Sequence, residues 1–109
     1  TLSPFFERSL MSVSSLEQIQ SILSDHHAIL AQDYDVVRIG IFGSWARNEA
    51  TQDSDIDILV VFGKTPGFFK FLELEEQLAQ WLGRPVDLVT PGALKPRIGR
   101  RILREVVMV

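Results

Sequence analysis

The sequence predicts an α/β domain built around a small central sheet. Helical and strand-like hydrophobic patterns alternate along the chain, its 109 residues suit one compact domain, and an apolar fraction of 46% suffices for a buried core. The chain has no cysteine, which excludes disulfide frameworks, zinc ribbons and iron–sulfur sites. The apolar content also excludes an intrinsically disordered protein.

The chain is predicted to begin with an extension and a helix. Residues 1–13 show no clear period and are interpreted as an N-terminal extension, whereas residues 14–109 form the predicted domain. The pattern becomes helical at Ser14, with Ser14 or Ser15 as the N-cap and Glu17 three residues after Ser14, as in a capping box. An apolar stripe continues this helix through Leu16, Ile19, Leu23 and Leu30.

Two β-branched runs with little charge, residues 36–42 and 56–62, are typical of buried strands. Gly43 and Ser44 end the first run, and the next residues predict a short helix over 45–50 with Ser44 as its cap. A polar loop over 51–54 leads to the second run.

The C-terminal half predicts a helix, a strand, a basic helix and an edge strand. The helix covers residues 68–82, with Gly83 as its C-cap. The third strand covers 85–90, the basic helix 94–104 and the edge strand 106–109. This order of elements is that of an α/β domain.

The charge balance is mildly acidic, with 11 Lys and Arg against 14 Asp and Glu and a net charge of −3. This argues against direct nucleic-acid binding, which draws on a basic surface. No apolar run is long enough to span a membrane, and no basic leader precedes an apolar core. We therefore expect a cytoplasmic protein without a membrane partner.

Gly43 and Ser44 lie at a turn from a strand into a predicted helix, which favours an anion-binding site. The first backbone N–H groups of a helix have no partner inside it, and the helix dipole favours negative charge there. Gly43 lets a phosphate approach the backbone closely, and the Ser44 hydroxyl supplies a further donor. Glycine–serine pairs are also common in ordinary turns, so the interpretation depends on the acidic residues further along the chain.

Asp55 and Asp57 come after Ser44 with ten intervening residues, at the start of the second strand. Side chains two residues apart on a strand leave the same face, roughly 7 Å apart at the backbone. Such carboxylates raise each other's pKa unless a cation lies between them, and hard oxygen ligands favour Mg²⁺ or Mn²⁺ over zinc. Asp87 on the third strand joins them if the two strands are neighbours in the right register. Three carboxylates suit a two-metal site for phosphoryl transfer; the pair alone would suit a solvated turn.

The pattern G-S-x10-D-x-D with a later strand aspartate resembles the nucleotidyltransferase fold of the DNA polymerase β superfamily. The short chain resembles the minimal nucleotidyltransferases (MNT) in particular, over roughly residues 16–109. The resemblance implies a small mixed sheet with helices packed mainly on one side. Family members often have glycine where this chain has Asn48.

The same resemblance implies roles for the motif residues. Gly43 and Ser44 would bind the nucleoside triphosphate, and Asp55 and Asp57 would be the main metal ligands. Asp87 would complete the metal site and assist deprotonation of the acceptor hydroxyl. All three carboxylates are present, which argues against an inactive copy.

MNT proteins are commonly paired with a HEPN-domain protein in toxin–antitoxin modules of bacteria and archaea. The resemblance therefore implies an antitoxin that transfers AMP from ATP, with Mg²⁺, to a hydroxyl of a HEPN toxin, expected to be a tyrosine. The short chain agrees with a protein acceptor, since relatives that modify small molecules or nucleic acid carry extra domains to hold them. Two alternatives stay open: a non-catalytic antitoxin that acts by complex formation, and a transferase for an aminoglycoside-like small molecule. The sequence leaves the nucleotide base, the number of AMP units and homo- or hetero-oligomer formation undecided.

Arg47, after the glycine–serine turn, is expected either to contact the triphosphate or to pair with Glu49 or Asp53. Trp45 and Trp81 are interpreted as packing residues, with stacking on a base as the alternative for Trp45.

The two histidines and the basic helix also have interpretations. His26 and His27 are adjacent, which does not suit a metal pair and favours structural or surface roles. The basic helix carries five cations without an intervening acid: Lys95, Arg97, Arg100, Arg101 and Arg104. It is either a solvated amphipathic helix that covers the sheet or a docking face for an acidic partner or RNA.

Overall fold

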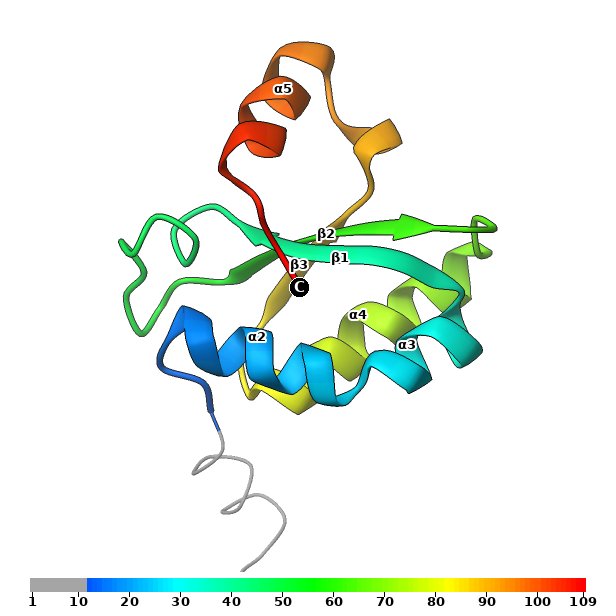
Figure 1. Cartoon of the computed structure of the whole chain (residues 1–109), viewed down its shortest axis with the longest axis horizontal. Coiled ribbons are helices and arrows are strands. Elements are labelled where there is room, and N and C mark those ends of the chain that lie inside the picture. The colour runs from blue at the N-terminus through cyan, green and yellow to red at the C-terminus, as the bar shows by residue number, and fades with distance from the viewer. Residues whose placement is uncertain (1–11) are drawn as a thin grey trace, which may run out of the picture.

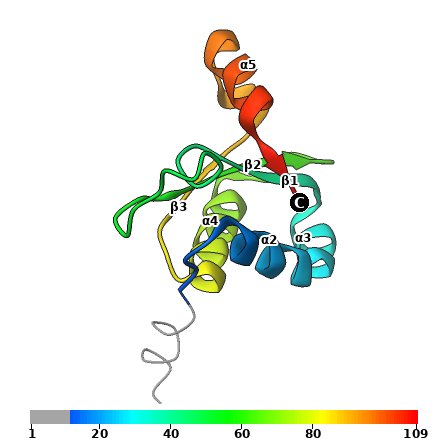
Figure 2. The same cartoon turned by 60° about the vertical axis from the view of Figure 1, so that its left-hand side comes forward.

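The computed structural model describes residues 12–109 and places a four-stranded sheet between two unequal layers of helix (Figure 1). Within residues 12–109, three α-helices cover one face of the sheet, and one α-helix with a short 3-10 turn before it lies on the other (Figure 2). This confirms the predicted α/β architecture with helices mainly on one side. Most of the predicted N-terminal extension, residues 1–11, lies outside the described residues. None of the helices in residues 12–109 has the length and apolarity that crossing a membrane requires.

The sheet has the strand order β3-β2-β1-β4 and is mixed. β1 (Val36–Phe42) pairs antiparallel with β2 (Ile56–Phe62) and with the edge strand β4 (Val107–Met108). β3 (Val86–Val89) pairs parallel with β2 and is reached through a crossover helix, as parallel neighbours require. β2 and β3 are therefore neighbours in the sheet, as the predicted site requires.

The main layer consists of α2 (Leu16–Asp25), α3 (His27–Tyr34) and α4 (Phe68–Leu82). Alternate residues of β1 and β2 point into this layer and are almost fully buried, among them Ile41, Ile56 and Ile58. The Glu75 carboxylate of α4 accepts a hydrogen bond from the Leu88 N–H at 2.9 Å. This bond fixes β3 to the crossover helix.

The opposite face carries η1 (Pro91–Ala93) and α5 (Pro96–Glu105). A small second core joins Ile102 of α5 to Phe42 of β1 and Leu59 of β2. Ile102 is the one buried side chain of α5, whereas Ile98 and Leu103 are half exposed. The helix therefore covers only part of this face.

The α2 N-cap is Ser15, one of the two predicted serines, and its hydroxyl accepts from the Gln18 N–H. Three other local predictions were wrong. The predicted capping box with Glu17 is not formed, because Gln18 rather than Glu17 reaches back to the Ser14 N–H. The first helix is interrupted at His26, whose backbone and ring both bond the Ile22 carbonyl. The short helix predicted over 45–50 is replaced by a series of turns over 43–48.

Candidate functional site

The site begins at Gly43, where β1 ends in a left-handed backbone conformation with φ +73°. A Cβ at this position would overlap the Asp57 carboxylate, with Cγ only 3.0 Å away. The left-handed conformation strains residues with a side chain, and the contact leaves no room for one. Gly43 therefore lets the first turn lie directly against a carboxylate of the next strand.

The turn after Gly43 presents backbone N–H groups to the same region. It is closed by bonds from the Arg47 N–H to the Gly43 carbonyl at 3.1 Å and from the Glu49 N–H to the Ser44 carbonyl at 2.8 Å. The N–H groups of Ser44, Trp45 and Ala46 form none of the bonds that close this turn. One helix-like turn thus offers the free donors that an anion site needs, although no helix follows it.

Asn48 also has a positive φ, 60°, and its conformation allows the turn to reverse direction. Asparagine tolerates the left-handed region better than most residues with a side chain, and glycine tolerates it best. This explains physically why glycine suits the corresponding place in proteins that share the motif.

Two of the three predicted carboxylates are brought together by the sheet itself. Asp57 and Asp87 are register partners on the parallel strands β2 and β3. Asp55 precedes β2 by one residue and is exposed. Asp57 and Asp87 lie on the sheet face opposite the main helical layer, because their neighbours Ile56, Ile58 and Leu88 are buried in that layer.

The electrostatics of the site centre on Asp57. Partial burial raises the pKa of its carboxyl group, and the negative charges of Asp87 and Asp55 raise it further. The Arg47 guanidinium opposes this increase, whereas Glu105 adds to it. Asp57 is thus a carboxylate whose charge is incompletely compensated by the protein.

The donor set suits a hard divalent cation. Carboxylate oxygens are the ligands that Mg²⁺ and Mn²⁺ prefer. A cation beside Asp57 would offset the charges of Asp87 and Asp55, which add to the effect of burial in raising its pKa. Within residues 12–109, no three carboxylate or imidazole side chains are already grouped as a metal site. The register of β2 and β3 pairs Asp57 with Asp87, and Asp55 lies two residues before Asp57, near enough for its charge to act on the Asp57 carboxyl group.

Arg47 lies beside the turn, where it is held by two acids. Its Nε donates to Glu49 Oε1 at 2.9 Å, and its Nη1 lies 3.2 Å from both carboxylate oxygens of Glu105. Glu105 Oε1 also accepts the Gly43 N–H at 3.2 Å. The predicted partner Glu49 is present, and Glu105 is a site residue that the sequence did not indicate. The sequence carried no local signal for it, since 62 positions separate it from Gly43.

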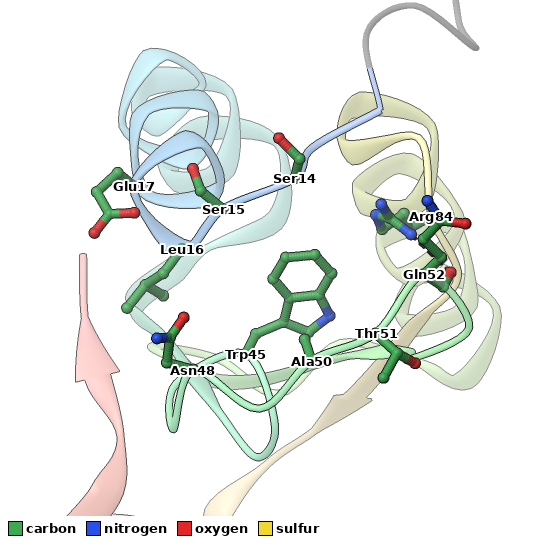
Figure 3. Close-up of a pocket in the computed structure, with 10 residues that line it drawn as sticks. All are labelled: Ser14, Ser15, Leu16, Glu17, Trp45, Asn48, Ala50, Thr51, Gln52 and Arg84. Carbon is green, nitrogen blue, oxygen red and sulfur yellow. Dashed lines mark hydrogen bonds between the residues drawn. The ribbon is translucent and has the colours of Figure 1, made fainter.

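Trp45 lies on the other side of the turn, next to a pocket of about 500 Å³ (Figure 3). This pocket opens between the start of α2 and the loop over residues 48–52, and none of the six predicted site residues lines it. Trp45 is 7% exposed and belongs to the main core, and the Arg84 guanidinium lies 5.1 Å from its ring centre. This supports the packing interpretation of Trp45.

The remaining candidates lie away from the turn. His26 stacks on Trp81, with ring centres 3.9 Å apart, and His27 is exposed, in agreement with structural and surface roles. The five cations predicted on the basic helix are all exposed, and none forms an ion pair within residues 12–109. We call these residues the basic face of α5: Lys95, Arg97, Arg100, Arg101 and Arg104.

Comparisons with known proteins agree with this geometry. The family model described as nucleotidyltransferase domain matches residues 23–109. A curated relative from Thermococcus cleftensis, protein adenylyltransferase MntA, is 50% identical over 91% of this chain and its own entire length.

Solved structures with a similar fold include nucleotidyltransferases and toxin–antitoxin complexes. One described as a minimal nucleotidyltransferase is 34% identical, with a TM-score of 0.67 over 82% of this chain and 93% of its own. A toxin–antitoxin structure with AMP-PNP is 26% identical, with a TM-score of 0.64 over 77% of this chain and 69% of its own. A complex of a tri-AMPylated HEPN toxin with an MNT antitoxin from Shewanella oneidensis, 23% identical, shares the fold with a TM-score of 0.61 over 83% of this chain and 70% of its own.

Proposed function

Because the chain belongs to the nucleotidyltransferase domain family, we propose that it is a protein adenylyltransferase that acts as the antitoxin of a HEPN toxin. The single observation that carries this proposal is the register of β2 and β3, which sets Asp57 beside Asp87 and opposite the glycine turn. The relative named MntA and the toxin–antitoxin structure with AMP-PNP support an adenine nucleotide as the donor.

The proposed reaction transfers AMP from ATP to a hydroxyl of the partner, expected to be a tyrosine. The hydroxyl oxygen forms a bond to the α-phosphorus, and the bond from that phosphorus to the bridging oxygen breaks and releases pyrophosphate. Asp87 takes the hydroxyl proton. The N–H groups of the turn and the Ser44 hydroxyl bind phosphate oxygens, and Arg47 supplies positive charge beside them.

Asp55, Asp57 and Asp87 would hold Mg²⁺, or Mn²⁺ in its place. When bound, such ions would neutralise the triphosphate and lower the pKa of the attacking hydroxyl. Burial, and after it the charges of Asp87 and Asp55, raise the pKa of Asp57; a bound cation would offset those charges, which supports this assignment.

A HEPN partner agrees with the shape of the site. The carboxylates lie on the sheet face that η1 and α5 cover only in part (Figure 2), so this chain builds little of an acceptor pocket within residues 12–109. A second protein would supply the remaining wall together with the hydroxyl.

The test is transfer of label from α-³²P-ATP to the protein product of the neighbouring gene, with Mg²⁺ present. We expect label on a tyrosine of the partner, and at least a hundredfold less with Asp55→Asn and Asp57→Asn combined. Asp53→Asn is the matched control, because Asp53 is an exposed acid of the same loop outside the proposed site.

Failure of the wild-type chain to label the partner, or equal labelling by the double variant, would overturn the enzymatic proposal. A double variant that still protects cells from the toxin would favour the non-catalytic antitoxin instead.

A further inference from the structure

The Glu105 carboxylate occupies one side of the anion cradle that the proposed function assigns to the triphosphate, between the Gly43 N–H and Arg47. The cradle consists of the Gly43 N–H, the turn after it and the Arg47 guanidinium. Glu105 Oε1 lies 3.2 Å from the Gly43 nitrogen and 3.2 Å from Arg47 Nη1, and Oε2 lies 3.2 Å from the same Nη1. One carboxylate thus accepts from backbone and guanidinium together, as a phosphate group would.

We propose that Glu105 is an internal competitor of the nucleotide triphosphate, which the nucleotide must displace in order to bind. This inference rests on the proposed function and adds to it a residue that sets nucleotide affinity. A donor N–H that already bonds a carboxylate is unavailable to a phosphate oxygen until that bond breaks. The carboxylate also repels the negative charge of the triphosphate.

The charges around Glu105 indicate that its carboxylate competes with the nucleotide for the cradle and does not help to bind it. Asp57 already has a raised pKa from its burial and from the charges of Asp87 and Asp55, and Glu105 adds a further negative charge to the same place. A residue that helped to bind the triphosphate would be expected to carry a donor or a positive charge. Glu105 carries neither when ionised.

The position of Glu105 connects the cradle to α5. It is the last residue of that helix, and its side chain is only 21% exposed. Displacement by a nucleotide would release the contact that ties this end of α5 to the turn.

Glu49 provides a matched control within the same contact set. It also pairs with Arg47, through Nε at 2.9 Å, but forms no hydrogen bond with Gly43. Glu105→Gln and Glu49→Gln therefore remove the same charge from the neighbourhood of Arg47. Only Glu105→Gln also removes a carboxylate from the cradle.

The experiment measures the dissociation constant of the full chain for AMP-PNP with Mg²⁺ by isothermal titration calorimetry. For Glu105→Gln we expect a dissociation constant about tenfold lower than that of the wild type, which is about 1.4 kcal/mol. Glu105→Ala, which removes the acceptor as well, should bind at least as tightly. Glu49→Gln should stay within about twofold of the wild type. Inorganic triphosphate should show the same gain with Glu105→Gln, because the competition concerns phosphate and not the base.

Unchanged or weaker binding by both Glu105 variants, with their melting temperatures near that of the wild type, would overturn the inference. An equal gain with Glu49→Gln would also overturn it, because the effect would then be general charge removal. If the wild-type chain itself binds no nucleotide, the proposed function fails, which is a separate result from a failure of Glu105 alone.

Discussion

Replacing Gly43 by alanine tests the geometry of the turn directly. Gly43 has φ +73°, and its missing Cβ leaves the space that the Asp57 carboxylate occupies. The substitution changes one hydrogen into a methyl group and removes no charge. Any loss of function must therefore come from the backbone or from the displaced carboxylate.

The magnitude has two contributions. The left-handed conformation costs an L residue roughly 1–2 kcal/mol. For a domain of this size, each kcal/mol lowers the melting temperature by roughly 4–8 °C. The overlap with Asp57 also forces the carboxylate or the turn to move, and a displacement of about 1 Å at a reacting group can cost on the order of a hundredfold in rate. We expect a chain that still folds but transfers AMP about a hundred times more slowly.

Two other glycines serve as controls. Gly83 has φ +71°, and its Cβ would meet the Ser12 Cα at 2.8 Å, whereas nothing lies within 4 Å of a Cβ at Gly67. Differential scanning calorimetry and AMP transfer per folded molecule are measured for the alanine variant at each position. Gly83→Ala should lose comparable stability and keep its activity, and Gly67→Ala should change neither. A Gly43→Ala chain as active per folded molecule as Gly83→Ala would refute the reasoning.

Three further predictions concern charge and backbone conformation. Asp57→Asn should melt at a higher temperature than the wild type at pH 7, because a raised carboxyl pKa means that the ionised form destabilises the fold. The difference in melting temperature should shrink as the pH falls through the raised pKa and should be gone below the ordinary value of 3.8. A variant less stable than the wild type at pH 7 would contradict this. Asn48→Ala should lower the free energy of unfolding, measured in urea, by about 1 kcal/mol, because φ is 60° at this position. Asn48→Gly should leave the free energy of unfolding unchanged, and equal losses in the two variants would contradict the reasoning. The double variant Arg100→Glu with Arg101→Glu should weaken binding of the partner at least tenfold at low salt and by a smaller factor at high salt, as measured by surface plasmon resonance. Unchanged affinity at low salt would exclude the basic face as a docking surface.

Much of the fold could be predicted because its local signals are strong. Residues 36–42, 56–62 and 68–82 have the predicted bounds, and Gly83 ends α4 with the positive φ that a C-cap requires. A short apolar, β-branched run that ends at a glycine is typical of a buried strand, and two such runs predict two strands. The prediction that Asp87 joins Asp57 depended on β2 and β3 being neighbours in the sheet. The crossover through α4 makes them parallel neighbours, with Asp57 and Asp87 as register partners.

The features that escaped prediction depend on tertiary contacts. The apolar stripe of the first helix continues through His26, and only the bonds of that residue to the Ile22 carbonyl, together with its stacking on Trp81, show where the helix breaks. Glu105 is one acid at the end of a basic helix. Its contact with Gly43 arises because β4 pairs with β1 and brings the end of α5 back to the turn.

The half-covered face of the sheet has a kinetic consequence. The carboxylates lie on the face where Ile102 is the one residue of α5 that joins a small core. Under the proposed function, water would therefore reach a nucleotide bound there until a partner protein covered it. A site exposed to water in this way should let the isolated chain hydrolyse ATP slowly. Addition of the partner should suppress this hydrolysis. The ratio in which a cell synthesises the two proteins would then set how much nucleotide is consumed without any modification.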